Sequence, residues 1–168
     1  MRAAFASAAL LALSACGLQP LYNGASGNGV AQSLAAVDVP EIPGRDGWLV
    51  RNALQNRLGV AGVATPAYRL DVRLDDALEA LGVLNDDTIS RERRILRARY
   101  QLVDLATGEI LLDATAGSDA GIDVVSSEYA TIAAEQTALE NLAKDIADRM
   151  ATRIALALRD HNGGHSAP

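Results

Sequence analysis

The sequence predicts an α+β fold: a two-layer sandwich in which two helices pack on one face of a four-stranded mixed sheet. Strands are indicated by stretches in which apolar and polar residues alternate, and helices by apolar residues at every third or fourth position. These stretches follow one another in the order β-α-β-β-β-α. A helix between the first two strands favours parallel pairing, whereas short turns between the later strands favour antiparallel pairing.

The first fifteen residues have the three parts of a secretory signal peptide. Met1–Ala15 contains Arg2 near its start, then a short apolar stretch, then small residues before Cys16. The apolar stretch is much shorter than the ~20 residues needed to cross a bilayer. Its end, Leu13-Ser14-Ala15-Cys16, resembles the bacterial lipobox, and this resemblance implies that Cys16 is diacylated on sulfur and becomes the N-terminus. The alternatives are a plain secreted protein with a free cysteine near its N-terminus and a cytosolic chain with an apolar start.

A flexible tether is expected over residues 16–36, which contain a Gly, Asn and Ser stretch that cannot bury apolar surface. The folded domain is expected over residues 37–159. Its first strand, around Val37–Ile42, contains and is followed by prolines, as is typical of a sheet edge. Gly47–Leu58 is predicted to be a helix, with Gly59 as its C-terminal cap.

Three further strands follow in the prediction. Tyr68–Asp75 alternates strictly between apolar and charged residues, as a strand with one buried face does, and a break is expected around Gly82–Asp87. The next strand is expected over Ile89–Leu105. A turn at Thr107-Gly108 then leads to a fourth strand around Ile110–Thr115.

The C-terminal part is predicted to be a loop, a long helix and a tail. Gly117–Asp123 is rich in Gly and Asp and is expected to be a loop. Tyr129–Leu158 has large apolar residues three or four positions apart, which form one continuous stripe on a helix. Residues 160–168 contain both histidines and are expected to be a polar, disordered tail.

Composition argues against several classes of function. The formal net charge is −6, whereas proteins that coat nucleic acid carry a basic surface. One cysteine and two histidines in the chain form no cluster with zinc spacing, so neither a metal nor a cofactor is expected. Asp75-Asp76 and Asn85-Asp86-Asp87 lack the pattern of an EF-hand loop and are interpreted as solvated turn acids. No catalytic residue is predicted.

A row of arginines is the most informative feature of the mature domain. Arg91, Arg93, Arg97 and Arg99 share one face of the predicted third strand, with Arg69 and Arg73 behind them if the second strand is adjacent. Guanidinium groups match phosphate oxygens geometrically, so these residues are candidates for contacts with phosphate or carboxylate groups. The alternative is a lattice of cross-strand ion pairs, for which the acidic candidates are Asp71, Asp75, Glu109 and Asp113.

Several fragments of the chain, taken in order, resemble the lipopolysaccharide-assembly lipoprotein LptE family, over nearly all of Cys16–Leu158. They are the lipobox, Cys16-Gly17-Leu18-Gln19-Pro20-Leu21-Tyr22, Leu49-Val50-Arg51-Asn52-Ala53-Leu54, Tyr68-Arg69-Leu70-Asp71-Val72, Tyr100-Gln101-Leu102, Thr107-Gly108 and Val124-Val125-Ser126-Ser127-Glu128-Tyr129-Ala130-Thr131.

The resemblance implies a lipoprotein anchored to the outer membrane on its periplasmic face. It further implies that the domain plugs an LptD-like β-barrel and that the complex inserts lipopolysaccharide into the outer leaflet. The arginine row would then meet phosphates and acidic sugars of lipopolysaccharide, or acidic groups inside the barrel.

Two other classes of function stay open from the sequence. One is a free lipid-binding carrier lipoprotein of the periplasm, which would need a deep cavity to shield acyl chains. The other is an outer-membrane hydrolase. Since no histidine lies between Cys16 and Arg159, a hydrolase would need a carboxylate or Lys144, the one lysine of the chain, as its base.

Overall fold

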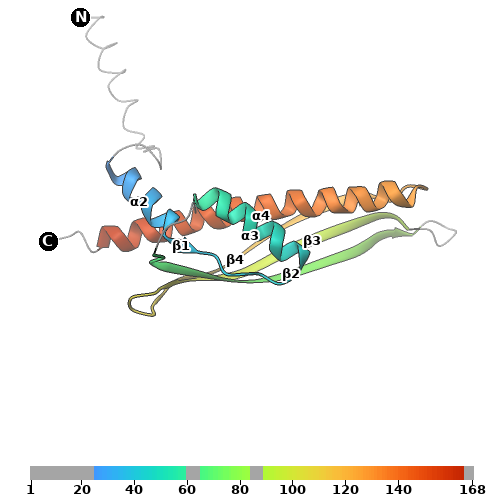
Figure 1. The fold of residues 1–168 in the computed structure, drawn as a ribbon. Helices are drawn as coiled ribbons and strands as arrows, with labels where there is room; N and C mark the ends of the chain where they lie inside the picture. The colour runs from blue at the N-terminus through green and yellow to red at the C-terminus, as the bar shows by residue number, and fades with distance from the viewer. Residues whose placement is uncertain (1–24, 60–64, 84–88, 165–168) are drawn as a thin grey trace, which may run out of the picture.

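Three helices and a four-stranded mixed sheet make up the computed structural model, which describes residues 25–59, 65–83 and 89–164 (Figure 1). The predicted fold class and element order are confirmed, with one additional helix at the start. In chain order the elements are α2 (Ala25–Ala35), β1 (Val37–Asp38), α3 (Gly44–Leu58), β2 (Tyr68–Val83), β3 (Ile89–Asp104), β4 (Ile110–Asp123) and α4 (Glu128–Gly164).

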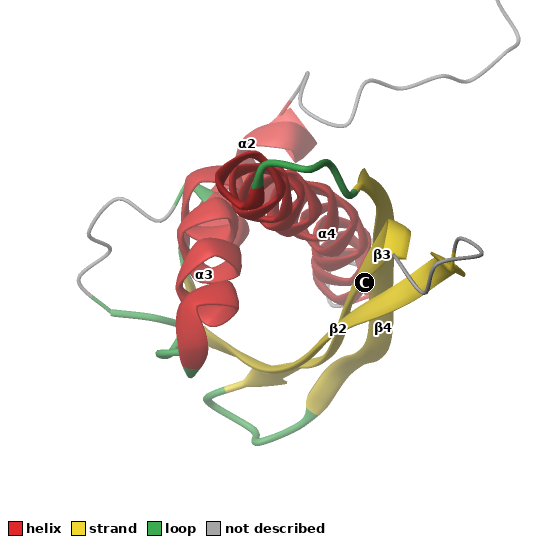
Figure 2. Cartoon of the chain, turned by 90° about the vertical axis from the view of Figure 1, so that its right-hand side faces the viewer, coloured by secondary structure: helices red, strands yellow, loops and turns green. Residues whose placement is uncertain are grey.

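The sheet has the strand order β1-β2-β3-β4. β1 pairs with β2 in parallel, with Val37 beside Tyr68, and the two longer pairings are antiparallel, as predicted. The long strands curve round α3 and α4, which lie on the concave side (Figure 2). No helix of the described residues covers the other face of the sheet.

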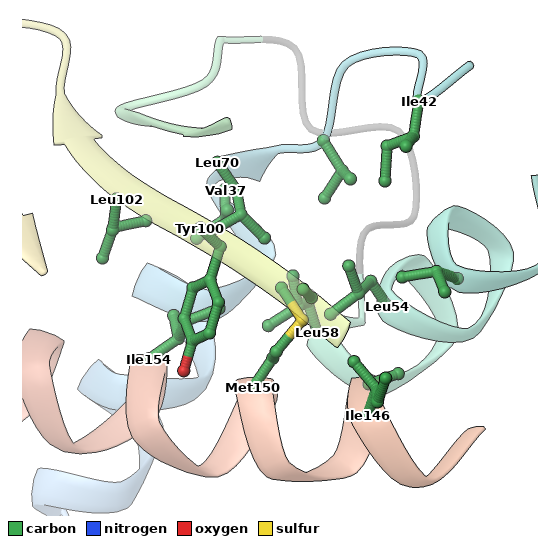
Figure 3. Packing of buried hydrophobic residues seen from close by; sticks show 14 of the residues in the cluster. Val37, Ile42, Leu54, Leu58, Leu70, Tyr100, Leu102, Ile146, Met150 and Ile154 are labelled. Carbon is green, nitrogen blue, oxygen red and sulfur yellow. The ribbon is translucent and has the colours of Figure 1, made fainter. Parts of the chain in front are cut away.

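The core lies between this concave face and the two helices. Every second residue of β3 from Leu96 to Leu102 is buried there, and Tyr100 points towards α4 (Figure 3). The predicted apolar stripe of α4 packs against them through Ile146, Met150 and Ile154, each of which is 0% exposed. Burying a large apolar side chain contributes roughly 1.5–3 kcal/mol, so this contact surface is the main source of stability.

α3 follows the prediction closely at its end and starts three residues earlier than expected. Gly59 adopts the left-handed conformation with φ 70° and its N–H donates to the carbonyl of Gln55, as predicted for a C-terminal glycine cap. Gly47 lies so close to the preceding segment that a Cβ there would be 2.4 Å from the carbonyl oxygen of Ile42. Only glycine allows α3 to approach this segment so closely.

The expected flexible tether is wrong where the structure describes it, because Ala25–Ala35 forms the helix α2. Val30 and Leu34 are buried, and Asn162 of α4 donates a hydrogen bond of 3.0 Å to Ser33 Oγ. Packing against the rest of the fold thus outweighs the low helix propensity of a segment that contains glycines and serines. Residues 16–24 and the predicted signal peptide lie outside the described residues.

The expected disordered tail is also wrong as far as Gly164, where α4 ends. The contact between Asn162 and Ser33 fastens the last turns of α4 to α2. Nearby, His161 Nε2 lies 3.7 Å from Asp104 Oδ2 at the end of β3. His161 is therefore part of the folded domain, whereas His165 lies outside the described residues.

The strands differ from the prediction at their ends. The first is reduced to Val37–Asp38, because Pro40 has no N–H for the sheet; the carbonyl of Val39 accepts a 2.9 Å hydrogen bond from Arg51 Nε instead. β2 continues through Gly82 to Val83. The expected loop at Gly117–Asp123 is the second half of β4, because β3 is long enough to pair with it as far as Asp123.

The outer edge of β4 is covered by two arginines of α4. Arg149 Nη1 donates to the carbonyl of Gly117 at 2.6 Å, and Arg153 Nη1 donates to that of Thr115 at 3.1 Å. An edge strand with unpaired carbonyl and amide groups is a template for pairing with another chain, and charged side chains along it hinder that pairing.

Replacing both edge arginines, in the variant R149Q/R153Q, should make the protein aggregate faster on heating because the edge of β4 becomes available for intermolecular pairing. The variant R45Q/R159Q makes the same change of charge away from this edge and is the control. Light scattering at equal protein concentration compares the two variants. Equal aggregation would show that the arginines protect the protein only through net charge.

Candidate binding surface on the outer face of the sheet

The four arginines predicted to share a strand face do so in the structure. Arg91, Arg93, Arg97 and Arg99 are exposed on the convex face of β3, because they are at odd positions and alternate with even positions that face the helices. The register adds Arg69 and Arg73 of β2 to the same face. Acidic residues equal in number share it, namely Asp71, Asp75 and Glu79 on β2 and Asp113, Asp119 and Asp123 on β4.

Many of these charges are paired across or along strands. Arg91 Nε lies 3.0 Å from Asp123, Arg93 Nε 3.7 Å from Asp119, and Arg99 Nη2 3.2 Å from Asp113. On β2, Arg69 Nε lies 3.0 Å from Asp71. Exposed pairs of this kind contribute about 0–1 kcal/mol each, so they order side chains more than they stabilise the fold.

The sequence anticipated only some of these partners. Asp71 and Asp113 were among the acidic residues considered for an ion-pair lattice. Asp119 and Asp123 are not among them, because a loop is predicted for their segment and a loop has no alternating faces. The pairing of β4 with the first half of β3 places both carboxylates beside arginines.

Asp113 is the most strongly engaged carboxylate of this surface. It accepts hydrogen bonds from Gln101 Nε2 at 2.8 Å and from Arg99 Nη2 at 3.2 Å. These bonds favour the ionised form and lower the pKa of Asp113 below its usual value, the bond from Gln101 having the larger effect. At neutral pH, therefore, one anion already occupies part of the hydrogen-bonding capacity of Arg99.

Two arginines on this face differ from the others. The side chains of Arg73 and Arg97 form no ion pair or hydrogen bond with any other residue that the structure describes. Arg73 lies directly opposite Arg99 in the register, so two positive charges face each other across the strands. All three arginines line a cavity of about 490 Å³, whose other lining residues are Leu74, Asp75, Ala98, Thr115, Ala116 and Gly117.

A seventh arginine of the sheet, Arg94, has no predicted role and lies on the concave face. Its guanidinium makes two hydrogen bonds to Asp76 of β2, at 2.9 and 2.5 Å, and one to the backbone carbonyl of Glu135 in α4 at 3.2 Å. The hydrogen bonds to Asp76 raise the pKa of Arg94. Asp76 is therefore a strand residue paired across the sheet, which corrects the interpretation of Asp75-Asp76 as turn acids.

A signal for Arg94 was present in the sequence. Arg94 occupies an even-numbered position, in phase with the buried Leu96, Ala98 and Tyr100, and so belongs to the face that meets the helices. An arginine on that face lies between the sheet and the helices, where its charge needs an acidic or hydrogen-bonding partner.

Other ionisable groups lie at the end of the molecule where α2 packs. Burial raises the pKa of Tyr68, and the charge of Asp104 raises it further.

Across the described ranges, no group of three or more His, Cys, Asp or Glu residues is placed to hold a metal ion. None of the helices in those ranges is long and apolar enough to cross a membrane. Cys16 lies outside the described residues.

Comparison with known proteins identifies the domain. The model of a family described as LptE, lipopolysaccharide-assembly, matches residues 33–154. No curated protein sequence matches the chain.

Solved structures with the same fold come from several bacteria. A protein named as a lipoprotein from Caulobacter crescentus is 22% identical, with a TM-score of 0.65 over 78% of this chain and 96% of that one. A minor lipoprotein from Acinetobacter baumannii is 17% identical, with a TM-score of 0.55 over 71% and 88%. Lipoprotein B from Nitrosomonas europaea is 12% identical, with a TM-score of 0.54 over 71% and 79%. At these identities the similarity shows the fold.

Removing the bridge between the sheet and α4, in the variant R94Q, should lower the free energy of unfolding by about 2 kcal/mol, because a partly buried carboxylate loses a charged donor. Side-chain exposures of only 18% for Arg94 and 22% for Asp76 limit the compensation by water. The neighbouring R93Q breaks an exposed pair and should cost less than about 1 kcal/mol. Urea unfolding measures both; equal losses would contradict a special role for Arg94.

Proposed function

Because the chain belongs to the LptE lipopolysaccharide-assembly family, we propose that it is an outer-membrane lipoprotein that plugs and helps assemble an LptD-like β-barrel in the lipopolysaccharide translocon. The observation that carries the proposal is the extent of the family match. Residues 33–154 include α3, the whole sheet and most of α4, so the match covers most of the folded domain. In this role the complex inserts lipopolysaccharide into the outer leaflet.

The membrane anchor in this proposal is Cys16. Two or more acyl chains attached at this residue would hold the domain far more firmly than a single chain, since each buried CH₂ contributes ~0.8 kcal/mol. Gly17, in the place where an Asp would follow the lipidated cysteine, favours delivery to the outer membrane. The names of the structural neighbours, all lipoproteins, are consistent with a lipid-anchored protein.

The proposed contact with lipopolysaccharide uses the convex face of the sheet. Arg91, Arg93, Arg97 and Arg99 present guanidinium groups that suit its phosphates and acidic sugars. Because no helix of the described chain covers this face, a large ligand or the wall of a barrel has access to it.

The role is one of binding and assembly, not catalysis, in keeping with a family of non-enzymatic lipoproteins. The packing of the domain also favours a plug over a free lipid carrier. The space between the sheet and the helices is filled by large side chains such as Leu54, Tyr100, Leu142 and Met150, each less than 3% exposed. A carrier would have to open this core to shield acyl chains.

Purification of the tagged lipoprotein from outer membranes in a mild detergent tests the proposed partner. We expect a large β-barrel protein to copurify in near-stoichiometric amount, identified by mass spectrometry. Recovery of the lipoprotein alone, or with bound lipid only, would contradict the plug and support the carrier instead.

The variant C16S tests the anchor. It removes the only thiol of the chain, so the protein should lose its acyl chains and move from the membrane fraction to the soluble fraction after cell lysis. S14G keeps a small residue in the lipobox and should stay in the membrane fraction. If C16S also stays there after a salt wash that releases peripheral proteins, the proposed anchor is wrong.

A further inference from the structure

The opposed arginines Arg73 and Arg99 need a physical explanation. Side chains directly opposite each other on antiparallel strands have Cβ atoms about 4.5–5.5 Å apart, and like charges in such a pair are destabilising. The same face places Asp75 opposite Arg97, yet these two residues form no ion pair within 4 Å. The fold therefore keeps a local excess of positive charge although carboxylates are available on the neighbouring positions.

The three arginines of this region are neighbours in the sheet. Arg97 and Arg99 are two residues apart on β3, about 7 Å along the strand, and Arg73 lies beside them on β2. The cavity of about 490 Å³ that they line gives the anion access from solvent. Gly117, opposite Arg97, also lines this cavity, and a Cβ there would lie 3.5 Å from Arg97 Cγ.

The other arginines of the convex face lack this arrangement. Arg69, Arg91 and Arg93 each have a carboxylate within 4 Å, and no second arginine stands directly opposite any of them. Their positive charges are therefore already neutralised within the described part of the chain. An incoming anion would have to displace a carboxylate from each of these arginines, but not from Arg73 or Arg97.

The number of donors favours a phosphate group over a carboxylate. A phosphate monoester carries about −1.5 to −2 charge at pH 7 and has three strongly accepting oxygens. Arg73 and Arg97 offer whole guanidinium groups, and Arg99 offers the donors that Asp113 does not use. A carboxylate has one charge and two oxygens, so it would neutralise less of the positive charge of the three guanidinium groups.

We infer that Arg73, Arg97 and Arg99 form a binding site for one phosphate monoester of a lipid headgroup, with Arg73 as a contact outside the predicted row. The inference rests on the proposed function, because that function supplies a phosphorylated lipid, lipopolysaccharide, as the ligand. It narrows the proposed contact from the whole arginine row to one site on the convex face.

Binding to the mature lipoprotein in micelles of a neutral detergent tests the site, with affinities measured by isothermal titration calorimetry. The probes are lipopolysaccharide, the same lipopolysaccharide after removal of its phosphates, and inorganic phosphate. We expect R73Q and R97Q each to weaken binding of lipopolysaccharide at least fivefold. R69Q makes the same change on the same strand, at an arginine already paired with Asp71, and R45Q makes it on α3; both should change the affinity less than twofold.

A second pair of variants tests the site in the opposite direction. D113N should bind lipopolysaccharide several-fold more tightly, because it frees Arg99 from its carboxylate partner. D119N makes the same change of charge but frees Arg93 instead, and should change the affinity less than twofold.

The outcomes separate the site from its alternatives. Equal weakening by R73Q, R69Q and R45Q would overturn it in favour of a general electrostatic field. Unchanged affinity for the dephosphorylated lipid would show that the phosphate is not recognised. If inorganic phosphate binds as tightly as lipopolysaccharide, the site serves the free ion and the lipid assignment is wrong. Copurification of the barrel with the R73Q variant is measured separately. If the barrel still copurifies while the phosphate site fails, the proposed function stands without this site.

Discussion

The contact between the concave face of β3 and the apolar stripe of α4 determines most of this structure. Tyr100 and its even-numbered neighbours on β3 pack against Ile146, Met150 and Ile154, all of them fully buried. Since side chains alternate along a strand, burying the even positions turns every odd position outward. The arginine face is thus a geometric consequence of the core, and a shift of register by one residue would exchange the two faces completely.

The length of the strands has a different origin. Helix α3 covers only the middle of the sheet, while β2, β3 and β4 continue beyond it towards the start of α4 (Figure 1). No residue of α4 before Ala138 is buried, so apolar packing is thin in this part. Arg94 compensates for it by joining β2, β3 and α4 through one guanidinium group. The hydrogen bonds of Arg94 thereby connect the strands to α4 in a part of the sheet that the apolar core does not reach.

How far the sequence could lead depended on the strength of the local pattern. The period-two alternation of β2 and β3 and the stripe of α4 predicted the fold and the shared face of Arg91, Arg93, Arg97 and Arg99. β4 was predicted only to Thr115, because Gly117–Asp123 has the composition of a loop and becomes a strand only by pairing with β3. Likewise, α2 is stabilised by the burial of Val30 and Leu34 against the rest of the fold. This tertiary contact cannot be predicted from the local sequence. The ion pairs of Asp119 and Asp123 were missed for the same reason.

The unequal pairing of the surface arginines bears on whether this face is only structural. A surface kept solely for stability would be expected to avoid like charges on opposing positions. On the convex face, the opposing pairs Asp75 with Arg97, Glu79 with Arg93 and Arg91 with Asp123 carry opposite charges. Arg73 opposite Arg99 departs from this arrangement at one place, beside a cavity and a glycine. The sequence could have avoided the repulsion with a neutral residue at either position, at no cost to the core beneath. A repulsion that the fold does not require is most simply explained by an anion that binds there and removes it.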